Sequence, residues 1–309
     1  MDISLARILS LKDINFKIGV ISKIDPQFLW DNVKRGIDDA HQELSDFGLE
    51  IDYKGLNNDN YAAEIIISIQ EMIDKKMDAI IVVPVNNIQT ILKINEACDN
   101  GILVATLNDD ISNSRRCFYL GPQMSKSGRT AGELMGRFLN NKGNILIING
   151  NIESLEYKER LKGFYQVIKE HYSKIKIVDC YTYDYKENAA VRDEKFKSLL
   201  QKNPTINGIY DVDGASLYDV GNTIKEYKKL KDIVLIGHEI SNKVEELIKD
   251  GVIDACISQN PYSQGYSAVK MAFDYIVQNE KPLSHNMYTR IDIIVRENIA
   301  DHRNIINPY

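Results

Sequence analysis

The stretch Phe16-Lys17-Ile18-Gly19-Val20-Ile21-Ser22, followed by the segment from Trp30 to Phe47, decides the fold. The first part is rich in β-branched residues and has no proline, which is typical of a buried strand. The second part repeats apolar side chains at steps of three and four residues, which predicts an amphipathic helix. These apolar side chains are Trp30, Val33, Ile37, Ala40, Leu44 and Phe47. A strand, a loop and a helix in this order form the first half of a βαβ unit.

The rest of the chain repeats this alternation of strand and helix twice. The strands of the first run are expected at 50–55, 79–83, 102–107 and 117–120, and those of the second at 144–148, 175–181, 208–210, 233–236, 255–258 and 290–295. Each run has its own first strand. The sequence therefore predicts an α/β fold with two doubly wound, Rossmann-like lobes whose sheets are parallel.

Composition and net charge argue against several classes of function. The chain has 309 residues and a net charge of −6, which argues against nucleic-acid binding by this chain alone, because phosphate binding needs a basic face. No apolar stretch is long enough for a membrane span. Residues 1–7 lack the pattern of an export signal, so we expect a cytoplasmic protein. The four cysteines are widely spaced and are expected to be reduced, buried thiols.

Polar side chains follow the predicted strands, at the point where each strand ends. They are Ser22, Asn108, Asp109, Asn149, Asp211, Asp213, His238, Glu239, Gln259 and Asn260. Ligands of open parallel sheets bind beyond the carboxyl ends of the strands. Carboxylates and amides exchange hydrogen bonds with hydroxyl groups, so the set predicts a small, neutral, polyhydroxylated ligand. For any one of these residues, a role in a turn or a helix cap is the simpler explanation.

Two further residues are candidates, each with a plain alternative. Trp30 begins the apolar stripe, so a core role is as well supported as stacking on a sugar ring. Arg160 lies near the start of a predicted helix, where the helix dipole disfavours a cation. This position favours a role in the binding site over a surface ion pair. We expect no cofactor, no metal and no catalysis, because nucleophile, zinc and phosphate-loop motifs are missing.

Several segments resemble the superfamily of ribose-binding proteins and lactose repressors (LacI/GalR). They are Lys17–Ser22, Asp78–Pro84, Gly101–Asn108, Arg160-Leu161-Lys162-Gly163-Phe164, Leu235-Ile236-Gly237-His238-Glu239 and Gln259-Asn260-Pro261-Tyr262-Ser263-Gln264-Gly265. The resemblance extends over roughly residues 16–298, and the order and spacing of the segments make it specific. It implies the type I fold of periplasmic binding proteins, in which three crossovers join two lobes that close on a sugar in an interlobe cleft.

The resemblance also implies lobe boundaries. They are 1–16 for a residual hinge helix or linker, 17–121 with 260–289 for the N-terminal lobe, and 122–259 with 290–309 for the C-terminal lobe. By position, Trp30 takes the place of the sugar-stacking aromatic residue. Asn108 and Asp109 stand where the family often has aspartate and arginine.

In the C-terminal lobe, Arg160 matches the arginine that binds sugar hydroxyls, with Lys158 nearby. Tyr183 takes an aromatic position of the cleft, and Gln259 matches a crossover glutamine. Asp213 matches the aspartate of an Asn-Asp pair in which Val212 replaces the asparagine, and His238 and Glu239 replace an aromatic–aspartate pair. These departures argue against ribose itself. We expect that alanine at Arg160 or Trp30 weakens sugar binding with little loss of folding.

Residues 5–10 resemble the hinge helix that repressors of this superfamily insert into the DNA minor groove. The sequence therefore favours the effector-binding core of a LacI-type transcriptional regulator, which implies a homodimer and a DNA-binding head outside this chain. The first alternative is the sugar-binding receptor of an ABC transporter, which an export signal would support. The second is an enzyme on a similar frame, which turnover of a bound sugar would establish.

Overall fold

The computed structural model describes residues 15–57, 60–150, 155–226 and 233–301. The chain divides into two compact units, Met1–Pro122 with Asn260–Arg290 and Gln123–Gln259 with Ile291–Tyr309, here called the first and the second unit. The chain passes from one unit to the other three times. The hinge helix expected near the N-terminus falls outside the described residues.

The first unit contains a sheet of six strands in the order β11-β5-β4-β3-β1-β2, and every pair of neighbours is parallel. The strands are β1 (Phe16–Lys23), β2 (Leu49–Leu56), β3 (Ala79–Val82), β4 (Leu103–Leu107), β5 (Phe118–Gly121) and β11 (Asn286–Tyr288). The helices are α2 (Gln27–Leu44), α3 (Tyr61–Asp74), α4 (Ile88–Asp99) and α10 (Pro261–Gln278), and the 3-10 helix η1 (Ser45–Phe47) follows α2.

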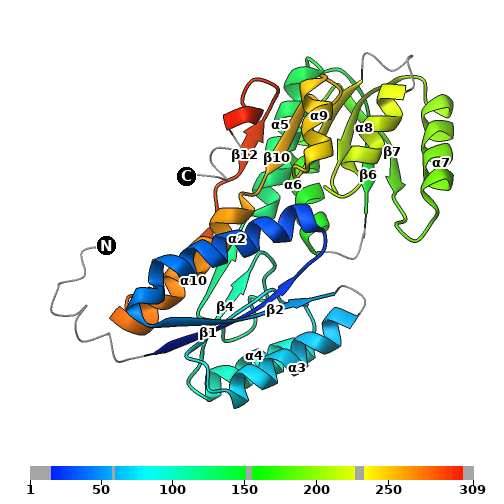
Figure 1. The fold of residues 1–309 in the computed structure, drawn as a ribbon. Coiled ribbons are helices and arrows are strands. Elements are labelled where there is room, and N and C mark those ends of the chain that lie inside the picture. The colour runs from blue at the N-terminus through cyan, green and yellow to red at the C-terminus, as the bar shows by residue number, and fades with distance from the viewer. Residues whose placement is uncertain (1–14, 58–59, 151–154, 227–232, 302–309) are drawn as a thin grey trace. The chain divides into compact units, whose positions relative to one another are not determined.

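Helices cover both faces of this sheet, with α2 and α10 packed together on one face and α3 and α4 on the other (Figure 1). Two glycines permit the close approach of α2 and α10. A Cβ atom at Gly36 would lie 2.1 Å from the carbonyl oxygen of Tyr262, and one at Gly265 would lie 2.0 Å from that of Val33. Both distances are far below a van der Waals contact, so larger side chains would push the helices apart.

The second unit has the same plan, with a six-stranded sheet in the order β12-β10-β9-β8-β6-β7. Its strands are β6 (Gly143–Asn149), β7 (Ile175–Thr182), β8 (Ile206–Asp211), β9 (Val234–His238), β10 (Ala255–Ser258) and β12 (Asp292–Ile294). Only β12 runs antiparallel to its neighbour within the described sheet. Its helices are α5 (Met124–Phe138), α6 (Leu155–His171), α7 (Ala189–Lys202), α8 (Leu217–Glu226) and α9 (Asn242–Lys249).

Apolar side chains on the two faces of the second sheet form separate clusters. Ile145 and Ile147 of β6 lie in the cluster that includes Phe164 of α6, and Leu146 and Ile148 lie in the cluster on the opposite face. This alternation is the two-residue period of a strand covered on both sides. The predicted fold class, two α/β lobes with mainly parallel sheets, is confirmed.

Two details differ from the sequence analysis. The strand β11 was not predicted, because its three residues carry no run of apolar side chains. The expectation of buried thiols is wrong for Cys180, which is exposed, whereas Cys98 and Cys117 are half-buried and Cys256 is buried. Cys180 lies on the edge strand β7, where alternate side chains face solvent.

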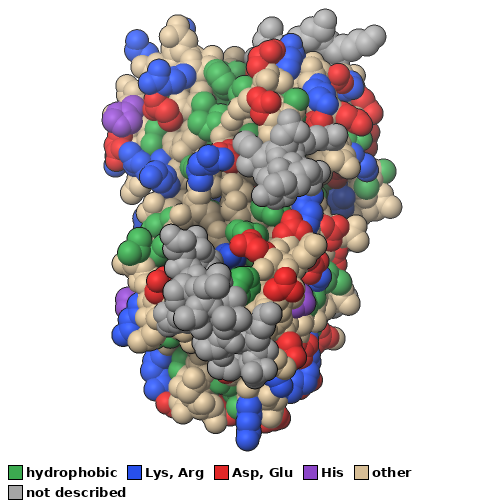
Figure 2. Space-filling model, turned by 60° about the vertical axis from the view of Figure 1, so that its left-hand side comes forward, with side chains coloured by type: hydrophobic (Ala, Val, Ile, Leu, Met, Phe, Trp, Pro, Cys, Tyr) green, Lys and Arg blue, Asp and Glu red, His purple; other side chains and the backbone are tan. Residues whose placement is uncertain are grey.

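The surface agrees with the charge balance of the sequence. Side chains of Lys and Arg are interspersed with those of Asp and Glu over the face shown in Figure 2. Among the residues that the structure describes, no helix combines the length and the apolar character needed to cross a bilayer.

Candidate ligand-binding site

At the carboxyl edge of the first sheet, Lys23 and Asp109 form an ion pair. Lys23 ends β1, and its Nζ atom lies 2.9 Å from Oδ2 of Asp109, just after β4. The same ammonium group lies 5.8 Å from the ring centroid of Trp30 and 5.6 Å from that of Tyr61, within cation–π range. Ser22 is buried, and its hydroxyl donates to the Lys23 carbonyl. The structure thus brings Trp30, Asp109 and Ser22 around a lysine that sequence reasoning missed.

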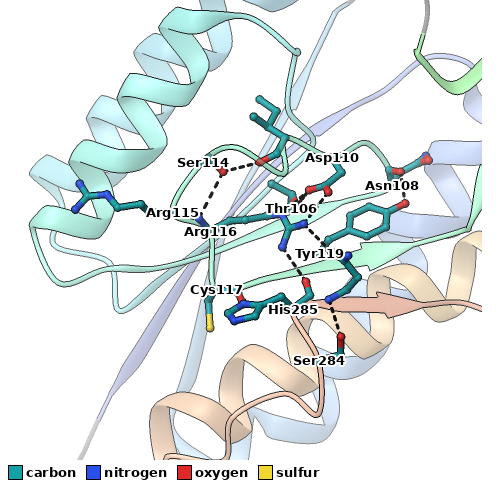
Figure 3. A network of polar contacts seen from close by, with 12 residues as sticks. Thr106, Asn108, Asp110, Ser114, Arg115, Arg116, Cys117, Tyr119, Ser284 and His285 are labelled. Atoms are coloured by element: carbon teal, nitrogen blue, oxygen red, sulfur yellow. Dashed lines mark hydrogen bonds and ion pairs between the residues drawn. The ribbon is translucent and has the colours of Figure 1, made fainter.

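Asn108 is held rigidly at the same edge. Its backbone adopts a left-handed conformation, with φ of 62°, directly after β4. Its carbonyl accepts a hydrogen bond from the Tyr119 hydroxyl at 2.8 Å (Figure 3). The side chain is buried, yet Oδ1 has no hydrogen-bond partner among the described residues. A buried acceptor of this kind costs free energy until a donor reaches it.

A hydrogen-bond network around Arg116 holds the loop that contains Asn108 in place. The Arg116 guanidinium contacts Asp110 through Nε at 2.5 Å and Nη2 at 2.7 Å, and Nη1 donates to the His285 carbonyl at 2.7 Å (Figure 3). Nη2 also donates to Asn286 at 2.7 Å. Because Asn286 begins β11, the network joins the loop after β4 to the edge strand of the sheet.

In the second unit, the cation Arg160 pairs with two carboxylates. It is 1% exposed, and Nη2 lies 2.8 Å from Glu156 and 3.1 Å from Glu239. Its Nη1 atom donates to the Val212 carbonyl at 3.0 Å. Burial raises the pKa of Glu239 to about 7, although the charge of Arg160 opposes the rise. Two carboxylates therefore share one guanidinium in a desolvated place.

Glu239 occupies a position like that of Asn108. It follows β9 directly and has a left-handed backbone with φ of 60°. Residues held in this region without being glycine are concentrated at functional sites. Gln259, which follows β10, donates a hydrogen bond to Glu239. The structure thus brings together Arg160, Glu239 and Gln259, as the sequence predicts.

Asp213 lies in the loop after β8 and is buried. Its Oδ1 atom accepts a hydrogen bond from the Ala215 amide at 3.1 Å, and its Oδ2 atom accepts one from the Tyr185 hydroxyl. Its neighbour Asp211 is also buried and accepts hydrogen bonds from the Asp213 amide at 2.9 Å and the Ser216 hydroxyl at 2.8 Å. Tyr185 was missed by sequence reasoning, which selected Tyr183.

Tyr183 and His238 have hydrogen-bond partners outside this group, and Lys158 lies at the surface. The Tyr183 hydroxyl donates to Asp219 at 2.5 Å, and its ring lies under the guanidinium of Arg192 at 4.8 Å. His238 is fully buried, with Nδ1 at 3.3 Å from the Ser127 hydroxyl and Nε2 at 2.8 Å from the Tyr210 hydroxyl. Lys158 is exposed on α6. A binding role for these three stays a prediction.

The burial of Arg160 and Trp30 argues against the expectation that alanine at either position leaves folding intact. Trp30 is 3% exposed and belongs to the core of the first unit, and removal of Arg160 would leave the buried Glu239 and the half-buried Glu156 without this cation. Truncation of a buried aromatic residue costs about 3–5 kcal/mol, and so does removal of one partner of a buried ion pair.

The carboxyl edges of both sheets therefore present buried hydrogen-bonding groups. Within the described residues, Oδ1 of Asn108, Oδ1 of Asn149 and Nε of Arg160 have no partner. Each of these three atoms can pair with a hydroxyl group. No group of three His, Cys, Asp or Glu side chains in the described part of the chain is arranged to hold a metal ion.

Comparisons with known proteins agree with this architecture. The D-allose-binding periplasmic protein of Escherichia coli (strain K12) is 20% identical over 253 residues, which cover 79% of each chain. A sugar-binding protein of a sugar ABC transporter from Bacillus halodurans superposes with a TM-score of 0.82 at 21% identity, over 93% of this chain and 99% of that one. A protein from Bacteroides fragilis named as a LacI transcriptional regulator superposes equally well, with a TM-score of 0.82 at 19% identity and the same coverage.

At these identities the solved structures establish the fold alone. The family is established by the sequence, because the periplasmic binding protein domain matches residues 18–281, which is most of the chain. The chain therefore belongs to the periplasmic binding protein domain family.

Proposed function

We propose that this chain is a non-enzymatic binding protein for a small carbohydrate or a related polyhydroxylated compound. The observation that carries the proposal is the set of buried polar atoms without a partner at Asn108, Asn149 and Arg160, all at the carboxyl edges of the two sheets. Hydroxyl groups donate to the two amide oxygens and accept from the guanidinium nitrogen. That the two edges serve one and the same ligand stays a prediction.

The comparisons support the receptor of an ABC transporter better than the transcriptional regulator favoured by the sequence. The relatives include a D-allose-binding periplasmic protein and a sugar-binding protein of a sugar ABC transporter. We therefore propose the receptor role first. The regulator role, with its homodimer, its cytoplasmic location and its separate DNA-binding head, is the second candidate, favoured by the Bacteroides fragilis structure.

The coding region of the native gene separates the two roles. An export signal ahead of this chain, together with loss of sugar uptake on deletion of the gene, would support the receptor. A DNA-binding head ahead of it, together with altered transcription on deletion, would support the regulator.

Binding itself is tested by thermal shift and titration calorimetry against pentoses, hexoses, disaccharides and polyols. A true ligand raises the unfolding temperature, because it binds only the folded state. Failure of every carbohydrate to bind, or chemical turnover of a bound sugar, would reject the proposal.

The variant Asn149→Ala tests one hydrogen bond to the ligand most directly. The substitution removes an acceptor that has no partner among the described residues, so the free protein should lose no stability. Ligand affinity should fall about tenfold, since one buried hydrogen bond is lost. Gln201→Ala, which removes an exposed amide on α7, is the control and should leave affinity unchanged.

A further inference from the structure

The carboxyl edge of the second sheet has an excess of negative charge. Four buried or half-buried carboxylates, those of Glu156, Asp211, Asp213 and Glu239, lie at this edge together with the cation Arg160. Arg160 pairs with Glu156 and Glu239 only. Within the described residues, neither Asp211 nor Asp213 has a Lys or Arg side chain at ion-pair distance.

The groups that donate to the two aspartates are all neutral. Asp213 accepts from the Ala215 amide and the Tyr185 hydroxyl, and Asp211 accepts from an amide and from the Ser216 hydroxyl. Neutral donors stabilise a carboxylate less than a cation does, and burial of a carboxylate without a cation is costly. These neutral donors therefore leave much of the negative charge of the two aspartates uncompensated.

The ionisation behaviour of the cluster agrees with this deficit. Burial, reinforced by the charge of Asp213, raises the pKa of Asp211 well above its ordinary value. Burial also raises the pKa of Glu239 to about 7, despite the hydrogen bond from Arg160. Both shifts mean that the ligand-free edge resists full ionisation and would gain from an added cation.

An independent observation points to a ligand at the same place. Asn149 ends β6, is 3% exposed, and by strand alternation shares the sheet face of Ile147. Its Oδ1 atom has no partner within the described part of the chain. The next residue, Gly150, lies against Asp213, because a Cβ atom there would be 2.0 Å from Oδ2. The residue directly after this buried amide thus contacts the carboxylate that lacks a cation.

We infer that the ligand carries a protonated amine as well as hydroxyl groups, as an amino sugar or an amine-bearing polyol does, and that Asp213 with Asn149 receives the amine. The inference rests on the proposed function. An ammonium group donates three hydrogen bonds and supplies the missing positive charge, whereas a neutral sugar would supply only hydrogen bonds.

Matched pairs of sugars test the inference without any mutation. Titration calorimetry at pH 7 compares glucosamine with glucose and N-acetylglucosamine, and galactosamine with galactose and N-acetylgalactosamine. At least one amine should bind about tenfold more tightly than both its neutral parent and its acetylated form, as expected for a charged hydrogen bond. Neutral sugars that bind as tightly as the amines, or more tightly, would overturn the inference and leave the proposed function standing. Failure of all carbohydrates to bind would overturn the proposed function itself.

A variant identifies the group that recognises the amine. Asp213→Asn should reduce the preference for the amine about tenfold and leave the affinity for the neutral parent nearly unchanged. Glu194→Gln removes an exposed carboxylate on α7 and should preserve the preference. Thermal unfolding of each ligand-free variant shows that it is folded. A preference that survives in Asp213→Asn would overturn the assignment of Asp213.

Discussion

The Nε2 atom of His238 lies 2.8 Å from the hydroxyl oxygen of Tyr210, and the opposite ring nitrogen lies 3.3 Å from the Ser127 hydroxyl. Both nitrogens of a fully buried imidazole are thus engaged within the second unit. Burial, followed by the nearby charge of Arg160, lowers the pKa of His238 well below its ordinary value. His238 therefore acts as a neutral interior residue directly before Glu239.

Tyr210→Phe should destabilise the second unit. The substitution removes the hydroxyl partner of His238 but keeps the ring stacked on Phe164, whose centroid is 4.3 Å away. One buried nitrogen is then left unpaired, at a cost of about 1–3 kcal/mol. Urea unfolding measures the loss. Tyr165→Phe, at an exposed tyrosine of α6, is the matched control, and equal stability of the two variants would contradict the role of this hydrogen bond.

Glu239→Gln should change the pH dependence of stability. The pKa of Glu239 is about 7 in the folded protein, above its ordinary value of 4.5, so the folded state holds a proton that the unfolded state releases. The stability that this proton contributes is complete below pH 4.5 and is lost as the pH rises through 7. The free energy of unfolding of the variant, minus that of the wild type, should therefore rise by about 3 kcal/mol between pH 4.5 and pH 8. Parallel curves for the two proteins would contradict the raised pKa.

Arg116→Ala should destabilise the first unit strongly, because it leaves Asp110 without its cation and breaks the bonds to His285 and Asn286. The Arg116 side chain is 5% exposed, and loss of one member of such a pair costs about 3–5 kcal/mol. The neighbouring Arg115 pairs with Asp99 at the surface, so Arg115→Ala should unfold close to the wild-type urea concentration. Similar midpoints for both variants would refute the importance of the network.

Gly128→Ala should disturb both packing and binding. A Cβ atom at Gly128 would lie 1.8 Å from the carbonyl oxygen of Arg160, so α5 and α6 must separate. We expect a loss of about 1–3 kcal/mol in stability and weaker ligand binding, since Arg160 moves with α6. Gly132→Ala, where the nearest atom is 3.1 Å away on the same helix pair, should cost less. Differential scanning calorimetry can rank the two variants, and the reverse order would contradict this account.

The fold could be predicted from the sequence because its signals are local. The stripe from Trp30 to Leu44 is buried along α2, as its spacing predicts. The strand β11 was not predicted because its three residues form no apolar run and Asn286 is held by Arg116, which is distant in the sequence. No local pattern contains such a contact.

The candidate site could be predicted only in part. Glu239 and Asp213 follow from their places after strands, Arg160 follows from its place near the start of a helix, and resemblance to a family supports all three. Sequence alone could not choose Tyr185 over Tyr183. The two tyrosines are only two residues apart, and only the folded chain shows that Tyr185 reaches Asp213 whereas Tyr183 reaches Asp219. It also could not show that Glu239 shares the guanidinium with Glu156, since Glu239 is distant from Arg160 in the sequence.

The interrupted course of the chain through its two units has a consequence for biosynthesis. The helix α10 covers β1, β3 and β4, yet a ribosome reaches Asn260 only after it has made all of Gln123–Gln259. At usual translation speeds the interval between Pro122 and Arg290 lasts about ten to thirty seconds. During that time the nascent first unit displays the apolar strand surface that α10 later shields, so this surface stays exposed to solvent until α10 has been made.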